Sequence, residues 1–233
     1  MSAVATVSSD AFASGFYTVS EAARLLQIEN SRRIYGWLAG YRGSLAEAVI
    51  VRDYAPIGGS QELSFWDLME VRFINHFRKQ GVPLQTLRKT ATKARVEFGK
   101  KHPFALSNVT FLTDRKRVFQ QVVEETGDKK TLDILGDQYE MYDIIEKILA
   151  EGVSFDPATG LADAWQPLPN ECPNVIVSPR YAYGHPVVSK IPTSALFRLW
   201  KAEGGNLQRV ARAFGVSPEA VSEAVSFEGR LPH

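Results

Sequence analysis

The amino-acid sequence predicts an α+β fold that is mainly α-helical. Apolar residues recur with helical spacing at both ends of the chain, whereas the β-prone stretches are short. The 233 residues suffice for one large or two modest domains. We divide the chain into a flexible arm (1–16), a winged helix-turn-helix domain (17–104), a small β-containing segment with a linker (105–174), and a C-terminal domain of three helices (175–233).

The stretch from Tyr17 to Tyr41 predicts two short helices joined by a tight turn. Thr18 and Glu21 form a capping-box pattern that starts the first helix. Asn30 or Ser31 can cap the second helix. The residues expected to face inward are Val19, Ala22, Ala23 and Leu26 in the first helix, and Ile34, Trp37 and Leu38 in the second. This is the geometry of a helix-turn-helix, whose second helix enters the DNA major groove.

The outward side of the second predicted helix carries Arg32 and Gly36, flanked by Arg33 and Tyr35. Arginine can bond guanine or phosphate bidentately, and tyrosine can bond phosphate. An exposed helical glycine lowers helix stability, so Gly36 is interpreted as room for a partner to approach the backbone. The face therefore predicts double-stranded DNA as a partner. An ordinary helical hairpin with a solvated face would give the same spacing.

A strand-turn-strand pattern follows and predicts a wing. Val49–Tyr54 is expected as the first strand, Pro56–Ser60 as the turn and Glu62–Ser64 as the return strand. Arg42 and Arg52 could reach phosphates from this wing, although plain surface charge explains each of them equally well.

Two longer helices are predicted next, from Ser64 to about Gln80 and from Pro83 to about Phe98. The outer face of the second is basic, with Arg88, Lys89, Lys93 and Arg95. These side chains could support DNA binding, or they could form the charged face that any surface helix carries.

In the middle of the chain the spacing of apolar residues changes from a helical to a β-strand pattern. Val109–Thr113 and Val118–Val123 are β-prone and would form a hairpin, and Leu132–Leu135 would add a third strand. A helix is expected over Tyr139–Ala150, and residues 153–174 are interpreted as a loop-rich linker.

The C-terminal part predicts a strand at Val175–Val177 and then three helices. Thr193 or Ser194, Asn206 and Ser217 are their expected caps. The last helix would expose Glu219, Ser222, Glu223 and Ser226, and two carboxylates would repel phosphates. We therefore interpret this trio as a protein-contact or dimerisation module. Its candidate partner residues are Leu196, Trp200, Phe214, Val221 and Val225.

Charge is strongly segregated although the net charge is only +1. Residues 1–123 hold 17 Lys/Arg against 10 Asp/Glu, whereas residues 124–170 hold 3 against 11. The basic first half suits a polyanionic partner. The acidic middle could instead mimic nucleic acid in the basic cleft of a bound protein, with Asp133, Glu140 and Asp143 as test positions.

No enzyme, cofactor or membrane class is indicated. The four histidines make no metal-ligand spacing with each other or with Cys172, and no P-loop or dinucleotide fingerprint is present. The single cysteine rules out an intrachain disulfide, and no run of about 18 apolar residues predicts a membrane span. We expect no cofactor, no metal, no catalytic residues and a cytoplasmic location.

The same residues resemble known bacterial families. YTVSEAARLLQIENSRRIYGWLAG, the wing-like stretch and LSFWDLMEVRFINHFRKQGVPLQTLRK resemble the MerR-like winged helix-turn-helix. VIVSPRYAYGHPVVSKIPTSALF and the trio ending GVSPEAVSEAVSFE resemble a small antitoxin-associated helix-turn-helix family, through Gly184, Pro186, Val187, Val188, Pro192 and Thr193. With HPFALSNVTFLTDRKRVF between them, they resemble the large two-domain VapB-type antitoxins.

This resemblance implies a dimeric DNA-binding repressor that controls its own operon and neutralises a PIN-type ribonuclease toxin. The resemblance implies that Thr18, Ser31, Arg32, Arg33 and Tyr35 face DNA. Asn30 in the turn, and Arg42 and Arg52 of the wing, complete the predicted DNA-binding set. The chain lacks the long coiled coil of MerR regulators, so their promoter-twisting mechanism is not carried over. A toxin-inhibiting protein with secondary DNA binding, and a regulator without a toxin, remain alternatives.

Overall fold

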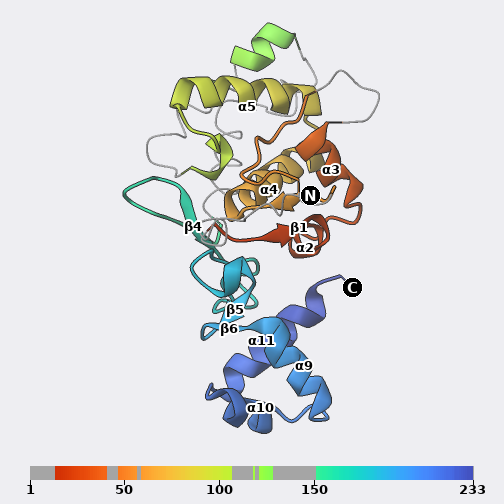
Figure 1. The fold of residues 1–233 in the computed structure, drawn as a ribbon, viewed down its shortest axis with the longest axis vertical. Helices are drawn as coiled ribbons and strands as arrows, with labels where there is room; N and C mark the ends of the chain where they lie inside the picture. Colours follow the sequence, from red (N-terminus) through yellow and green to blue (C-terminus); the bar gives the residue numbers. More distant parts are fainter. Residues whose placement is uncertain are drawn as a thin grey trace, which may run out of the picture. The chain divides into compact units, whose positions relative to one another are not determined.

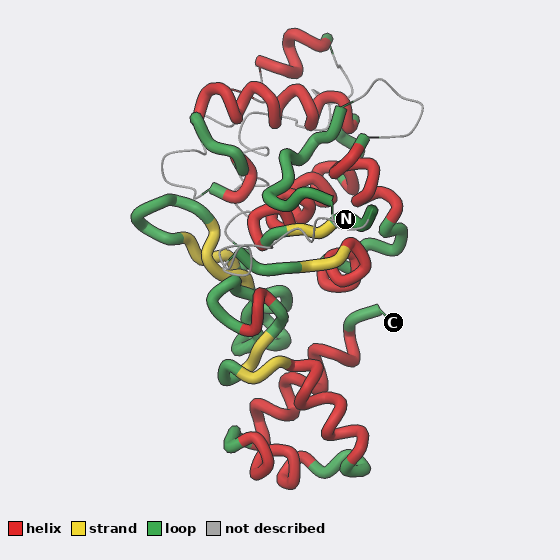
Figure 2. Tube along the Cα trace, viewed as in Figure 1, coloured by secondary structure: helices red, strands yellow, loops and turns green. Residues whose placement is uncertain are grey.

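The computed structural model describes residues 14–40, 47–56, 59–106, 118, 121–127 and 151–232. In this part of the chain helices predominate, and the strands form small two-stranded antiparallel sheets (Figure 1; Figure 2). The predicted α+β class is therefore confirmed.

The chain forms two compact units, each assembled from segments distant in the sequence. The first unit holds Met1–Gln27, Tyr54–Phe65 and Ala164–His233. The second unit holds Ile28–Asp53 and Trp66–Asp163.

Helices dominate the second unit. Its elements are α3 (Arg32–Ala39), nearly all of α4 (Phe65–Lys79), α5 (Leu84–Phe98), the 3-10 helix η1 (Pro103–Ala105), β3 (Val153–Phe155) and the start of β4 (Ala162–Trp165). Its fully buried side chains include Ile34, Trp37, Leu68, Phe73, Ile74, Phe77 and Leu87. The Phe73 ring stacks on Phe104 with centroids 4.2 Å apart, which fixes the segment after α5 against α4.

The first unit joins the two ends of the chain. Its elements are β1 (Tyr17–Thr18), α2 (Val19–Leu25), β2 (Glu62–Leu63), η2 (Ala182–Gly184), β5 (Val187–Val188), β6 (Ile191–Pro192), α9 (Thr193–Ala202), α10 (Leu207–Phe214) and α11 (Pro218–Arg230). Figure 1 shows α9, α10 and α11 packed together. Their common core includes Leu196, Val210, Val221, Ala224 and Phe227.

Three helix starts agree with the capping signals. Thr18 and Glu21 form the complete capping box of α2. Asn206 and Ser217 cap α10 and α11 with their side chains. The cap predicted at Thr193 or Ser194 is wrong, because both residues lie inside α9 and Thr193 Oγ1 bonds Glu228 at 2.5 Å instead.

The predicted strand at Val49–Tyr54 is absent, so this segment forms no wing hairpin. The backbone N–H groups of Val49 and Ile50 both donate to the Trp37 carbonyl, at 2.9 and 3.2 Å. Arg95 Nη2 donates to the Val49 carbonyl at 2.6 Å. These groups therefore find partners outside a β-ladder. The return strand exists as β2, but it pairs with β1, where Tyr17 lies opposite Leu63.

Three further predictions need correction in the middle of the chain. Residues 118 and 121–126 are helical, so the strand predicted at Val118–Val123 is wrong. The region 153–174 contains β3 and β4 and is not only a linker. Val175–Val177 forms isolated bridges, Ile176 to Val187 and Val177 to Trp165, not a strand. The predictions at 109–113, 132–135 and 139–150 lie outside the described residues.

Candidate nucleic-acid interface

The exposed side of α3 presents the residues predicted to contact DNA. Arg32 and Arg33 are exposed, and Tyr35 is 43% exposed although it is large and partly apolar. In the part of the chain that the structure describes, neither arginine side chain forms a hydrogen bond or an ion pair with another protein group. The opposite side of α3 buries Ile34 and Trp37 in the core of the second unit. A rigid helix therefore holds two cations and a phenol at the surface.

Gly36 does not have the predicted role. It is buried, together with Trp37 and Leu38, and does not lie on the exposed side of α3. A glycine here leaves room for core packing, so it offers no path for a ligand to the backbone.

The polar residues around the turn mainly support the helix ends. The Thr18 hydroxyl is committed to the capping box of α2, although the residue is exposed. Asn30 Oδ1 accepts from the Arg32 N–H at 3.1 Å, and Ser31 precedes α3 without a side-chain capping bond. These contacts hold the start of α3, from which Arg32 projects.

Of the two arginines assigned to the wing, the structure describes only Arg52. Arg42 lies outside the described residues. Arg52 is half-buried, and its Nη1 atom is buried without a hydrogen-bond partner among the described residues. Arg52 therefore lies in a different environment from the exposed pair on α3.

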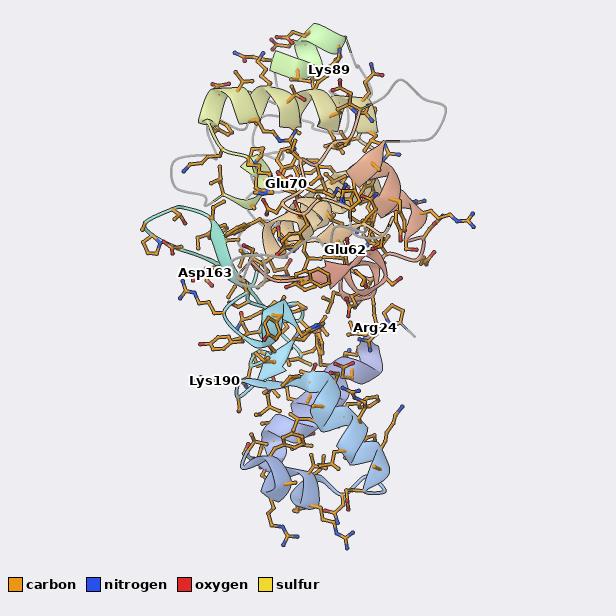
Figure 3. The ribbon with its side chains drawn as sticks, viewed as in Figure 1. Arg24, Glu62, Glu70, Lys89, Asp163 and Lys190 are labelled. Atoms are coloured by element: carbon orange, nitrogen blue, oxygen red, sulfur yellow. The ribbon has the colours of Figure 1, made fainter. Side chains whose placement is uncertain are left out.

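The basic face of α5 is largely used within the second unit. Arg88 donates to the Glu47 carbonyl at 2.7 Å, and Lys93 forms a 2.7 Å ion pair with Glu125. Arg95 bonds the carbonyls of Val49 and Lys101. The contacts of Arg88 and Arg95 hold the segment after α3 against α5. Lys89 is the member of the predicted basic face for which no such contact is described (Figure 3).

The candidate partner residues of the C-terminal trio fall into two groups. Leu196 and Val221 have no exposed area, so they form the core of the first unit. Trp200, Phe214 and Val225 are partly exposed. Glu223, predicted to be exposed, is half-buried and accepts from Asn174 N and Nδ2 at 2.7 and 3.0 Å.

The first unit contains a joint between its N-terminal and C-terminal segments, formed by Tyr17, Gly184, Pro186 and Thr193. The Tyr17 hydroxyl donates to the Gly184 carbonyl at 2.7 Å, and Tyr17 is completely buried. The Thr193 N–H donates to the Pro186 carbonyl at 2.9 Å. Burial, together with the charges of nearby groups, raises the pKa of Tyr17 and keeps its hydroxyl a donor.

A second contact ties α2 to α11. Arg24 Nη2 lies 2.7 Å from Glu228 Oε2, and Arg24 Nε donates to the Pro232 carbonyl at 3.1 Å (Figure 3). Glu228 is 3% exposed and also accepts from the Thr193 hydroxyl. Glu228 and Pro232, near the end of the chain, therefore hold α2 in place within the first unit.

The structure also gathers a buried polar cluster in the second unit that the sequence did not reveal. We define it as Asp53, Asp67, Glu70 and His102, with Arg95 and Lys101 at its edge. Burial lowers the pKa of His102, but its interactions with the carboxylates of Asp53 and Glu70 outweigh this and raise it to about 9. The sequence offered one signal for this cluster, because Asp67 and Glu70 are spaced i and i+3 and so lie on one face of a helix.

No family model matches the chain. It is 27% identical over 226 residues to a Mycobacterium tuberculosis protein named "Putative antitoxin VapB45", and the match covers 90% of this chain and 92% of that protein. The chain therefore resembles a VapB-type antitoxin. The crystal structure of Rv2018 from Mycobacterium tuberculosis has a TM-score of 0.68 at 25% identity, covering 90% of this chain and 96% of that one. In the part of the chain described, no helix is long and apolar enough to cross a membrane.

Proposed function

We propose that the protein is a sequence-specific DNA-binding repressor and the autoregulating antitoxin of a type II toxin–antitoxin operon. The observation that carries the antitoxin role is the match to an antitoxin-named protein over 90% of this chain. DNA binding is supported by the exposed Arg32, Arg33 and Tyr35 on α3, whose other side is anchored in a core.

Arg32 and Arg33 would contact the major groove, while Tyr35 would bond phosphate. Each arginine that makes a bidentate contact with a base contributes about 1–3 kcal/mol of discrimination. Since phosphate contacts release counterions, affinity should fall steeply as salt rises. A homodimer would present two copies of α3 to a palindromic operator.

The test is fluorescence anisotropy with the DNA upstream of the gene, at two salt concentrations. Arg32→Ala/Arg33→Ala is compared with wild type and with Arg198→Ala/Arg212→Ala, which removes the same charge from exposed positions on α9 and α10. We expect specific binding to be lost only in the α3 variant. Equal weakening of both variants, or specific binding that survives loss of Arg32 and Arg33, would contradict the assignment.

Toxin neutralisation would use the partly exposed apolar side chains Trp200, Phe214 and Val225 of the C-terminal trio. Aromatic side chains at the centre of an interface carry a large share of binding energy. Co-purification with the product of the adjacent gene tests this role. Trp200→Ala should weaken the complex while circular dichroism stays unchanged, and an undisturbed complex would exclude this surface.

A separate experiment tests the alternative that the acidic middle segment mimics nucleic acid in the basic cleft of a toxin. Asp133, Glu140 and Asp143 lie outside the described residues. Charge reversal at these positions should dissociate a toxin complex that depends on mimicry, and should not affect one that depends on the C-terminal trio.

A further inference from the structure

Backbone strain is concentrated around one hairpin of the first unit. Five non-glycine residues of the described chain have positive φ, and four of them lie beside β5 and β6: Ala182 and Tyr183 in η2, and Ser189 and Lys190 in the turn. Residues with a side chain rarely adopt this conformation, because Cβ then comes too close to the backbone. Such strain persists where surrounding contacts fix it, and it is concentrated at functional sites such as ligand-binding loops.

Contacts with the N-terminal segment fix the conformation of η2. The Phe16 N–H donates to the Tyr183 carbonyl at 2.9 Å, and the Tyr17 hydroxyl donates to the Gly184 carbonyl at 2.7 Å. Within the loop, the Gly184 N–H donates to the Tyr181 carbonyl at 2.8 Å. The backbone is therefore held in place before any partner arrives, which lowers the entropy lost on binding.

This fixed loop carries two tyrosine rings at the surface. Tyr181 and Tyr183 are 36% and 61% exposed, and they are the most exposed large hydrophobic side chains of the described first unit. The Tyr181 hydroxyl has no hydrogen-bond partner among the described residues. By contrast, Tyr17 is completely buried. The two exposed rings offer flat apolar surfaces on which a planar group can stack.

The same region carries positive charge. Residues 178–192, SPRYAYGHPVVSKIP, contain Arg180 and Lys190 but no Asp or Glu, and both cations are exposed. Lys190 lies in the β5–β6 turn, and its ammonium group forms no hydrogen bond or ion pair with the described residues (Figure 3). Cations thus precede and follow the two tyrosines along the chain, which suits a partner with repeated negative charge.

Single-stranded nucleic acid has both features that this region can bind. Its bases are flat and can stack on aromatic side chains, whereas the base faces in a duplex are covered by the neighbouring base pairs. Its phosphates attract arginine and lysine. Proteins that bind single strands without sequence preference use the same combination of aromatic rings and cations.

We propose that Arg180, Tyr181, Tyr183 and Lys190 form a binding site for single-stranded nucleic acid. The phenol rings stack on bases, and the two cations bind phosphates. The site lies in the first unit, whereas the arginines of α3 belong to the second unit. It is therefore a further binding activity, independent of the proposed recognition of duplex DNA.

The test is fluorescence anisotropy of the full chain with labelled oligonucleotides of about 12 nucleotides, as single-stranded DNA, single-stranded RNA and duplex DNA of one sequence. Tyr181→Ala/Tyr183→Ala should weaken single-strand binding by about 5–150-fold for each ring that stacks on a base, and should leave duplex binding unchanged. Tyr181→Phe/Tyr183→Phe keeps both rings and should retain binding. Lys190→Gln should reduce the slope of log affinity against log salt concentration by about 0.7. The DNA and RNA strands together show which sugar the site prefers.

Tyr35→Ala, which removes an exposed tyrosine from α3, is the matched control and should leave single-strand binding unchanged. Wild-type protein that binds neither single strand would overturn the proposal, so the test does not depend on the folding of a variant. Binding that survives Tyr181→Ala/Tyr183→Ala in a protein with unchanged circular dichroism would overturn it as well, since the strand would then bind elsewhere. Equal losses in the alanine and phenylalanine variants would exclude stacking.

Discussion

Replacement of Gly184 by alanine should disrupt the joint of the first unit. Gly184 has φ +91°, a conformation that costs a residue with a side chain about 1–2 kcal/mol. The added methyl carbon would lie 2.2 Å from Tyr17 Oη and 2.8 Å from Cζ, so the buried phenol must move. That movement breaks the bond to the Gly184 carbonyl, which costs about 1–3 kcal/mol more. The expected total is about 2–5 kcal/mol.

Two matched variants separate these contributions in urea unfolding followed by circular dichroism. Gly204 has φ +61°, and no atom of the described residues lies within 4 Å of a methyl group added there, so Gly204→Ala measures the backbone cost without the clash. In a Tyr17→Phe background the closest clash is absent, so Gly184→Ala should cost less than in wild type. The reasoning is refuted if Gly184→Ala costs no more than Gly204→Ala, or if its cost is the same in both backgrounds.

The remaining predictions also concern stability. Glu228→Ala should destabilise the protein by about 1–3 kcal/mol in urea, because it removes the ion-pair partner of Arg24 and the closer of the two acceptors of the buried Thr193 hydroxyl. An effect below that of a surface substitution would contradict this. Ser189 and Lys190 both have positive φ in the two-residue β5–β6 turn, so Ser189→Asn/Lys190→Gly should raise the melting temperature; an unchanged value would count against strain there. Burial and neighbouring cations lower the pKa of His76, so the unfolded chain binds more protons below about pH 6.5. Stability should fall as pH drops below that value, and less so in His76→Gln; identical pH profiles would exclude this contribution.

Local chemistry made much of the helical structure predictable. The capping box at Thr18 and Glu21 gave the start of α2, and Ser217 with Pro218 gave the start of α11. These signals lie within a few residues of the structure they specify, because a cap bonds the first turn of its own helix. The exposure of Arg32 and Arg33 also follows from the register of α3 with Ile34 and Trp37.

Contacts between distant segments were not predictable in the same way. The β-prone residues of Val49–Tyr54 predicted a strand. The backbone groups of Val49 and Ile50 bond the Trp37 carbonyl and Arg95 instead of a neighbouring strand. Gly36 was placed on the wrong side because a glycine has no side chain to reveal whether its face is buried.

The sequence by itself determined the helices α2 to α5 and α9 to α11 and the cations that α3 presents, because periodicity and capping act over one or two turns. It did not determine the helical residues 121–126, which it predicted as a strand. Only the tertiary structure decided that β2 pairs with β1, that Arg24 meets Glu228, and that Asp53, Asp67, Glu70 and His102 form one buried cluster. In each case residues far apart in the chain are brought together by burial of the apolar faces around them, and burial has no direction that a local pattern could encode.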